Sequence, residues 1–406
     1  MSNTHPFTVI EGGLARNRQA KQTKTFLRAR AVQSRLMGVI GLHLEFRQKL
    51  GPDQTETLHQ LFYLDVEEYG LDTYKGIPLA DVKGPHTEVL DKELQSMFGG
   101  LGSPYQDITQ REAYFLIQQY AARNTKAGEP LPGETAEYRF ILAHPLTLTA
   151  EEHQVLMDKL CTPIRSDYER IHYFLMRCCG RDYEAAAYLA VPGLDLHQIP
   201  FPEPATFYRN VIDPAQDGGY VCESLIDRDQ GPYQMISHLT VGPQGIDTFQ
   251  VLSTHKLSHE EANLITAREL YILAFRILSS PEETQEALDC HLLGSLTNEH
   301  ENGTLKLLFQ PNNDHVNQPT YRLDDDTYAM ILVSADNELL LCSHTEAVLQ
   351  TLSQDFFHPD RGILKHSQLL PLGAYLFQFP ILQMYLDSDF YSFFEFIKYL
   401  TEKQDQ

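Results

Sequence analysis

The chain has 406 residues, of which 42% are apolar and 21% charged, and this balance excludes an intrinsically disordered protein. Its net charge of −23 disfavours binding to nucleic-acid phosphates and to anionic lipid headgroups. No apolar run approaches the roughly 20 residues that span a bilayer, and we expect neither a membrane segment nor a secretory signal. Six cysteines without a C-x-x-C pair predict a reducing, cytoplasmic location.

The first 50 residues depart from this acidic character, with nine Lys or Arg and two Glu. Seven cations follow one another without an acidic residue between them: Arg16, Arg18, Lys21, Lys24, Arg28, Arg30 and Arg35. One interpretation is an arm that binds nucleic acid or an acidic partner. We favour the other, a segment that is solvated or lies on the protein's own acidic surface, since one basic segment is weak evidence for nucleic-acid binding.

In the first half of the chain, strand patterns come before helical ones. Residues 36–47 and 58–68 read as a hairpin around the turn Gly51-Pro52-Asp53. The glycine-rich residues 98–107 lack the spacing of a phosphate-binding loop and predict a flexible connection. Helical patterns cover residues 109–122, 149–160, 166–179 and 182–190, and the short apolar run 138–143 predicts a buried strand.

The second half opens with strand patterns at residues 220–227, 233–241 and 247–254. Helical signals then extend from 258 to about 289. Further strands are predicted at 304–310, 327–334 and 338–342, followed by a helix that begins at Ser343. Because strands and helices are grouped rather than alternating, the pattern favours an α+β fold over a doubly wound sheet.

Four prolines between residues 192 and 204 predict a domain boundary, because such a stretch suits neither a helix nor a central strand. We therefore expect two domains, at residues 1–195 and 205–406. Each would mix short antiparallel strands with capped amphipathic helices.

Several predicted helices begin with Ser or Thr followed three residues later by Glu, the capping-box pattern. The pairs are Thr109 with Glu112, Thr149 with Glu152, Ser166 with Glu169, Ser258 with Glu261, Ser280 with Glu283 and Ser343 with Glu346. The stretch SHEEANLI at 258–265 is also one residue away from the zinc motif H-E-x-x-H, with Asn263 in place of the second histidine. We interpret His259 as a first-turn residue rather than a zinc ligand, because no third ligand is indicated.

Two groups of acidic residues are candidate metal sites. Asp53, Asp81 and Lys83 resemble a nuclease pattern in which two acids hold Mg²⁺ and the lysine positions water, although so short a pattern also arises by chance. Asp324, Asp325 and Asp326 offer three carboxylates, but successive side chains on a strand point to opposite faces. We favour a solvated turn for this second group.

The C-terminal residues 375–400 are dense in aromatic side chains. If residues 388–400 form a helix, one apolar stripe results, and further aromatics widen it. We favour packing into the core, but large exposed aromatics also mark partner surfaces. The residues of the predicted surface for a partner or for self-association are Phe390, Tyr391, Phe393, Phe394, Ile397 and Tyr399.

The acids and hydroxyls of this chain thus read mainly as helix caps and solvated turns. We expect a non-enzymatic protein-binding or regulatory protein without a cofactor, which associates through its C-terminal segment. The alternative is a metal-dependent hydrolase or nuclease built on the acidic candidates.

Overall fold

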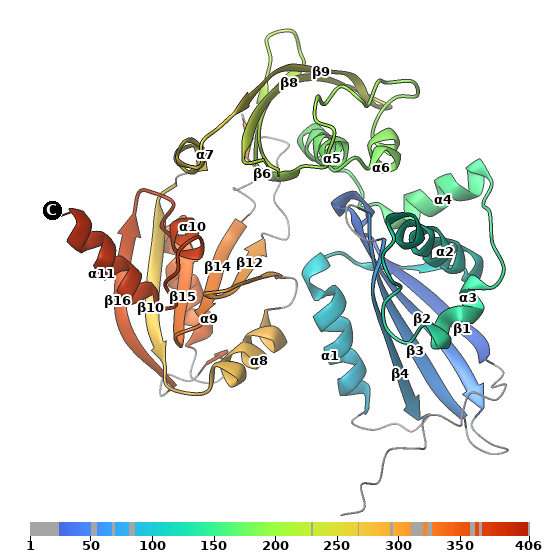
Figure 1. Ribbon diagram of the computed structural model, residues 1–406, viewed down its shortest axis with the longest axis horizontal. Coiled ribbons are helices and arrows are strands. Elements are labelled where there is room, and N and C mark those ends of the chain that lie inside the picture. Colours follow the sequence, from blue (N-terminus) through green and yellow to red (C-terminus); the bar gives the residue numbers. More distant parts are fainter. Residues whose placement is uncertain are drawn as a thin grey trace, which may run out of the picture.

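The computed structural model describes residues 24–404 except 50–54, 67–69, 81–85, 229, 267, 293–294, 310–319, 323–326, 358–361 and 365–367. Within these residues the chain forms 11 α-helices and three antiparallel sheets, which confirms the α+β class. No helix of the described part has the length and apolarity needed to cross a membrane. The three sheets are arranged as an arch, with the second sheet at its top (Figure 1).

The first sheet has the order β4-β3-β2-β1-β5. Its strands are β1 (Lys24–Val32), β2 (Val39–Lys49), β3 (Thr55–Asp65), β4 (Gly70–Ala80) and β5 (Tyr105–Ile108). One face packs through Leu42 and Phe62 against α2 (Gln110–Ala127), α3 (Thr135–Leu142) and α4 (Ala150–Leu160). The opposite face is partly covered by α1 (His86–Phe98) and the short helix η2 (Gly99–Leu101), where Phe98 contacts Leu61. The predicted hairpin is confirmed as the β2–β3 pair.

The second sheet has the order β13-β6-β7-β8-β9, formed by β6 (Thr206–Pro214), β7 (Tyr220–Asp227), β8 (Tyr233–Gly242), β9 (Gly245–Lys256) and the short β13 (Tyr321–Arg322). It packs against α5 (Asp167–Cys179) and α6 (Tyr183–Tyr188), with Phe174 and Cys178 in contact with Met235 and Phe249. Helix η1 (Arg35–Met37) and α5 join this unit to the first sheet.

The core of the second unit continues through the proline-rich stretch. Ile199 and Phe201 are buried in the same cluster as Leu175, on the helix before that stretch. The two-domain division at residues 195–205 stays a prediction, and the packing places apolar residues of both sides in one core.

The third sheet has the order β11-β12-β14-β15-β10-β16. Its strands are β10 (Leu270–Ile277), β11 (Leu296–His300), β12 (Gly303–Phe309), β14 (Thr327–Ser334), β15 (Glu338–Ser343) and β16 (Leu369–Phe377). Helices α8 (Pro281–His291) and α9 (Glu346–Phe356) cover one face, and α10 (Ile381–Leu386) and α11 (Phe393–Gln404) cover the other. Helix α7 (His259–Thr266) connects this unit to the second (Figure 1).

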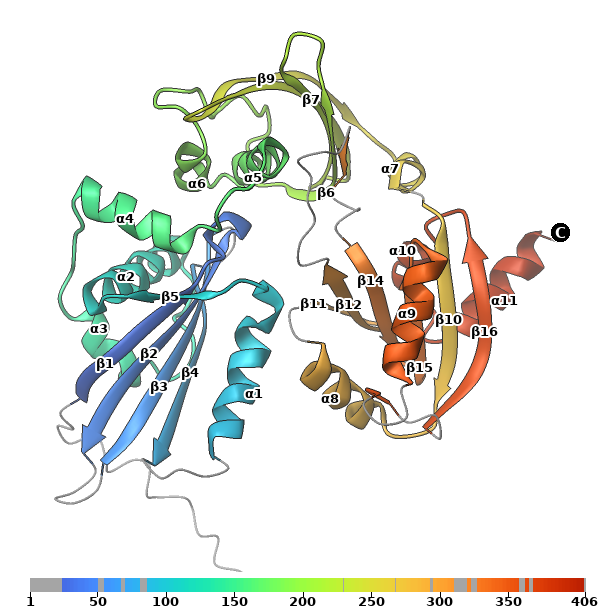
Figure 2. The same cartoon turned by 180° about the vertical axis from the view of Figure 1, so that it is seen from behind.

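The two ends of the arch meet. Helices α1 and α8 lie side by side in both views (Figures 1 and 2), and Lys92 Nζ lies 2.5 Å from a carboxylate oxygen of Glu286. Strand β11, at one edge of the third sheet, also contacts η2. The opposite edge of that sheet, β16, faces away from the first unit (Figure 2).

Three predicted elements differ from the structure. Residues 138–143 lie mainly in helix α3, where Tyr138 and Ile141 are three residues apart and both enter the core. Residues 270–277 form strand β10 inside the predicted helical region. Both faces of β10 are covered, so its apolar residues show no clear period, and the sequence pattern did not distinguish this strand from a helix. The predicted connection at 98–107 contains η2 and most of β5.

Most of the predicted caps are present. Reciprocal hydrogen bonds close the boxes at Thr109, Thr149 and Ser258. The hydroxyls of Ser166 and Ser280 accept the expected amide. The prediction for Ser343 is wrong, since Thr345 caps α9 instead.

Candidate functional site

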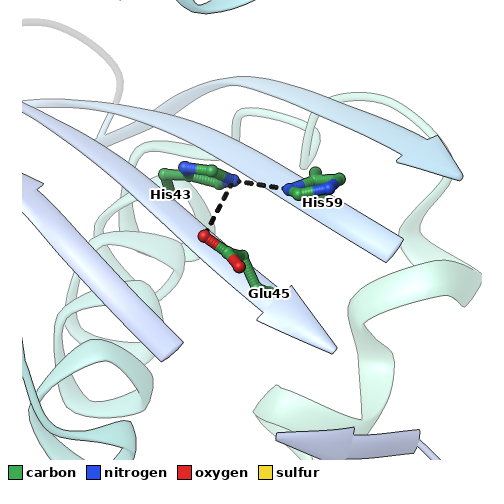
Figure 3. A group of neighbouring side chains, drawn as sticks. All are labelled: His43, Glu45 and His59. Atoms are coloured by element: carbon green, nitrogen blue, oxygen red, sulfur yellow. Dashed lines mark hydrogen bonds and ion pairs between the residues drawn. The ribbon is translucent and has the colours of Figure 1, made fainter. Parts of the chain in front are cut away.

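A group of polar side chains lies on the face of the first sheet that α1 only partly covers. Strand pairing sets Arg30 of β1 opposite His43 of β2, and sets Glu45 of β2 opposite His59 of β3. Side chains two residues apart on a strand share a face, so all four point to the same side of the sheet. Figure 3 shows the three side chains from β2 and β3 converging on one point.

The distances within this group define a chain of hydrogen bonds. Arg30 Nη2 lies 2.9 Å from His43 Nδ1, and His43 Nε2 lies 2.9 Å from His59 Nδ1. A guanidinium only donates, so His43 Nδ1 accepts and the ring carries its proton on Nε2, which donates to His59. A carboxylate oxygen of Glu45 lies 4.0 Å from His43 Nε2 and 3.7 Å from Arg30 Nη2.

Both imidazoles are held in the neutral form. His43 is 1% exposed, and burial together with the positive charge of Arg30 lowers its pKa to about 3. Burial also lowers the pKa of His59, against the opposing effect of Glu45. Neutral imidazole is the form that binds a metal ion.

Two imidazoles and one carboxylate are a set of metal-binding donors. Among the described residues, His43, Glu45 and His59 are the one group of three such side chains whose ligand atoms all lie within 4.8 Å of one another. No local motif in the sequence marks this group, because strand register brings its residues together. The usable signal was the alternation of His43 and Glu45 with apolar residues, combined with the predicted hairpin.

The acidic candidates of the sequence lie outside the described residues. This holds for Asp53, Asp81 and Lys83, and equally for Asp324, Asp325 and Asp326. His259 is the first residue of α7 and is exposed, and the cap formed by Ser258 and Glu261 accounts for the surrounding pattern.

Part of the basic segment forms strand β1, whose cations contact the protein's own groups. Lys24 Nζ donates to the carbonyl of Glu137 at 2.8 Å, and Arg28 donates to Asp107 at 2.7 Å. Arg30 binds His43 as described above, and Arg35 is buried in an ion pair with Asp182. Arg16, Arg18 and Lys21 lie outside the described residues.

The aromatic C-terminal segment is divided between core and surface. Phe393 is 1% exposed and packs against Tyr375 and Phe377 of β16, whereas Phe390 and Ile397 are partly buried. Tyr391, Phe394 and Tyr399 remain 60%, 47% and 40% exposed. The predicted surface thus retains three exposed aromatic side chains.

One of these aromatics, Tyr391, is connected through backbone and side-chain bonds to the end of β16 where exposed leucines lie. Leu370 pairs with Arg276, whose guanidinium binds Asp336, and the Asp336 amide donates to the carbonyl of Tyr391. Leu278 follows the last residue of β10, and its amide donates to the carbonyl of Gln368, two residues before Leu370. We define the C-terminal surface as the outer edge of β16 from residue 373 to 377 together with four exposed side chains: Leu278, Leu370, Tyr391 and Phe394.

Two surface pockets lie in the described part of the chain. One, of about 550 Å³, lies where the first and third units meet and includes Lys92, Glu286 and His300. The other lies between α4 and α6 and includes Cys161. Burial raises the pKa of this thiol to about 12, which keeps it protonated and a poor nucleophile.

Comparison of the chain with known protein families, with curated proteins and with solved structures finds no match. A functional proposal for this chain therefore depends on its own geometry.

Proposed function

We propose that this is a non-enzymatic binding protein that self-associates through the C-terminal surface. The observation that supports this most strongly is the outer edge of β16. Residues 373–377 (GAYLF) contain no charge, and among the described strands they pair only with β10, on their inner side. Unpaired backbone N–H and C=O groups at such an edge are ready to pair with another strand.

Natural edge strands are usually protected, and β16 is protected over only part of its length. Pro371 lacks an amide hydrogen, and the register shift beside it interrupts the regular ladder. Beyond the shift, residues 373–377 form regular pairs with β10 and contain neither proline nor a charged side chain. Leu376 within this segment is 49% exposed. Five residues of open edge suit pairing between two copies.

The exposed side chains around the edge favour an apolar contact. Leu278 and Leu370, at the residue-369 end of β16, are 61% and 53% exposed, and Tyr391 and Phe394 of the C-terminal segment are also exposed. Tyrosine and phenylalanine are enriched at interfaces because they bury large areas at low entropic cost. Antiparallel pairing of residues 373–377 about a twofold axis would place the Leu370 end of each copy beside the residue-377 end of its partner, so each exposed patch would contact the partner's strand end.

The charge of the chain sets a condition on this association. Two molecules that each carry −23 repel one another, whereas the contacting edge itself is uncharged. The Debye length falls from about 10 Å at 0.1 M salt to about 3 Å at 1 M. We therefore expect the association to strengthen with salt, unlike an association held by ion pairs.

Size-exclusion chromatography with light scattering on the full chain tests the proposal. The wild type should have the mass of two chains at 0.5 M NaCl, and Leu376→Lys should shift it to one, because a charge on the edge prevents pairing. Leu252→Lys is a matched control, since Leu252 is 52% exposed on β9, an edge strand of the second sheet. A wild type of single-chain mass at all salt concentrations, or equal masses for both variants, would contradict the proposal.

The sequence-based alternative, a metal-dependent hydrolase or nuclease, stays a prediction. Its residues Asp53, Asp81, Lys83 and 324–326 lie outside the described part of the chain, so no geometry supports it.

A further inference from the structure

Independently of the C-terminal surface, we propose that His43, His59 and Glu45 bind a divalent transition-metal ion of the Zn²⁺ type, and that Arg30 competes with the ion. The four residues come from three adjacent strands of one sheet, so a rigid backbone holds their relative positions.

The three ligand atoms all lie within 4.8 Å of one another, close enough to meet on one ion after their side chains rotate. Zn²⁺ binds imidazole nitrogen and carboxylate oxygen at about 2.0–2.2 Å, so two ligands of a tetrahedral ion lie about 3.3–3.6 Å apart. Here His43 Nε2 lies 2.9 Å from His59 Nδ1 and 4.0 Å from the Glu45 carboxylate. One distance is shorter and the other longer than the tetrahedral value, by about half an ångström each.

The donor set selects the class of ion. Imidazole suits Zn²⁺, Cu²⁺, Ni²⁺ and Fe²⁺, whereas Mg²⁺ and Ca²⁺ prefer sites made of oxygen ligands. Two neutral imidazoles and one anionic carboxylate make three protein ligands. A tetrahedral ion then has a fourth position for water or another molecule.

The cluster is reachable from solvent on one side. The Glu45 and Arg30 side chains are 22% and 26% exposed, whereas His43 behind them is 1% exposed. An ion would thus approach past the carboxylate and the guanidinium. The carboxylate attracts it, and the guanidinium repels it.

Arg30 opposes metal binding by a specific hydrogen bond as well as by its charge. A metal ion on His43 Nε2 displaces the proton from that nitrogen, and in the neutral ring the proton must then reside on Nδ1. Arg30 Nη2 donates to Nδ1 from 2.9 Å, so two donors would face each other. Arg30 must turn away as the ion binds, and Glu45 at 3.7 Å, the Tyr105 ring at 5.1 Å and Asp107, opposite Arg30 on β5, offer alternative partners.

Arg30→Gln is therefore the informative variant. Glutamine supplies a carbonyl oxygen that accepts a hydrogen bond from Nδ1–H, the usual outer partner of a metal-bound histidine. The affinity of the Arg30→Gln variant for Zn²⁺ should rise on the order of tenfold or more above that of the wild type. Arg28→Gln is the matched control, because Arg28 is also on β1 and its side chain is paired with Asp107 instead. It removes the same charge without changing the partner of His43.

Calorimetric titration of the full chain with Zn²⁺ tests both parts, with circular dichroism to show that each variant is folded. One ion should bind per chain, and His59→Gln and Glu45→Gln should each weaken binding at least tenfold, on the scale of losses from a metal's ligand environment. His144→Gln, at an exposed histidine outside the cluster, should bind as the wild type does.

Absence of Zn²⁺ binding by the folded wild type, or unchanged binding by folded His59→Gln, would overturn the site. Equal affinities of Arg30→Gln and Arg28→Gln would overturn the competition.

Discussion

At the scale of single residues, Arg35 and Asp182 form a buried ion pair. Both side chains are at most 2% exposed, and Asp182 also faces Arg177 at 3.7 Å. Arg35 further binds Glu184 at 2.8 Å, so its charge is shared between two carboxylates. Arg35 lies in η1 beside the first sheet, and Asp182 caps α6 of the second unit. This pair therefore ties two units of the arch together.

Asp182→Asn should destabilise the fold by about 3–5 kcal/mol, because it removes the buried carboxylate that faces two buried arginines, Arg35 and Arg177. Denaturant unfolding at pH 7 measures this free energy. Asp107→Asn is the control, since Asp107 forms an exposed pair with Arg28, and its loss should change stability little. Similar effects of the two substitutions would contradict the role given to the buried pair.

The stability difference between the wild type and Asp182→Asn should depend on pH in a defined direction. Burial alone would raise the pKa of Asp182, but the hydrogen bond and charge of Arg35 outweigh it and hold that pKa below its ordinary value of 3.8. In the unfolded chain this carboxyl gains a proton near pH 4, whereas the folded chain keeps it ionised to lower pH. Its stabilisation is therefore full above pH 5 and is lost as the pH falls below about 4. The stability gap between wild type and Asp182→Asn should narrow by pH 3, and a constant gap would refute this reasoning.

Some residue roles were predictable from the sequence because they are local. The glutamate at the third helical position follows the serine or threonine cap in the chain, so Thr109 and Thr149 could be assigned without knowing the fold. The histidine cluster could not be assigned in this way. His43 and His59 are 16 residues apart, and only the register of the β2–β3 hairpin brings them together.

At the scale of elements, α11 shows what a local pattern misses. The apolar stripe described from the sequence assumed a helix at 388–400, whereas α11 spans Phe393–Gln404. Its first turn is capped by Glu338, whose carboxylate accepts from the Phe393 amide at 2.6 Å and from the Ser392 hydroxyl at 2.9 Å. Glu338 lies on β15, more than 50 residues earlier, so its part of the cap has no local signal, whereas the Ser392 hydroxyl accepts the Glu395 amide at 3.2 Å within a local Ser-x-x-Glu pattern.

Glu338→Gln should destabilise the chain by about 1–3 kcal/mol, because the fully buried carboxylate both accepts hydrogen bonds and neutralises the helix dipole. Thermal and denaturant unfolding measure the change. Glu346→Gln removes an exposed acid from the first turn of α9 and should have a smaller effect. If the two variants are equally stable, Glu338 is not the cap that anchors α11.

Element type was least predictable where burial removes the hydrophobic period. Strand β10 lies between two covered faces, and its apolar run resembled a buried helix. The opposite error occurred at α3, an eight-residue helix too short to show its period clearly. The three strands β7, β8 and β9 were predicted closely, because glycine- and proline-containing turns separate them.

At the scale of the whole molecule, the sequence predicted the α+β class but not the three sheets. Grouped strands and helices were sufficient for the class. The number of sheets depends on which strands pair, and β10 joins the third sheet by pairing with β15 and β16, far along the chain. The C-terminal surface is likewise a product of this pairing, since it leaves β16 at the edge.

The central proposal is that β16 pairs with its counterpart in a second copy. Amide hydrogen exchange of the full chain, measured at high and at low protein concentration in 0.5 M NaCl, tests this pairing most directly. We predict that residues 373–377 exchange more slowly at high concentration, while amides of β15, inside the sheet, exchange alike at both. Identical exchange of residues 373–377 at both concentrations would contradict the account.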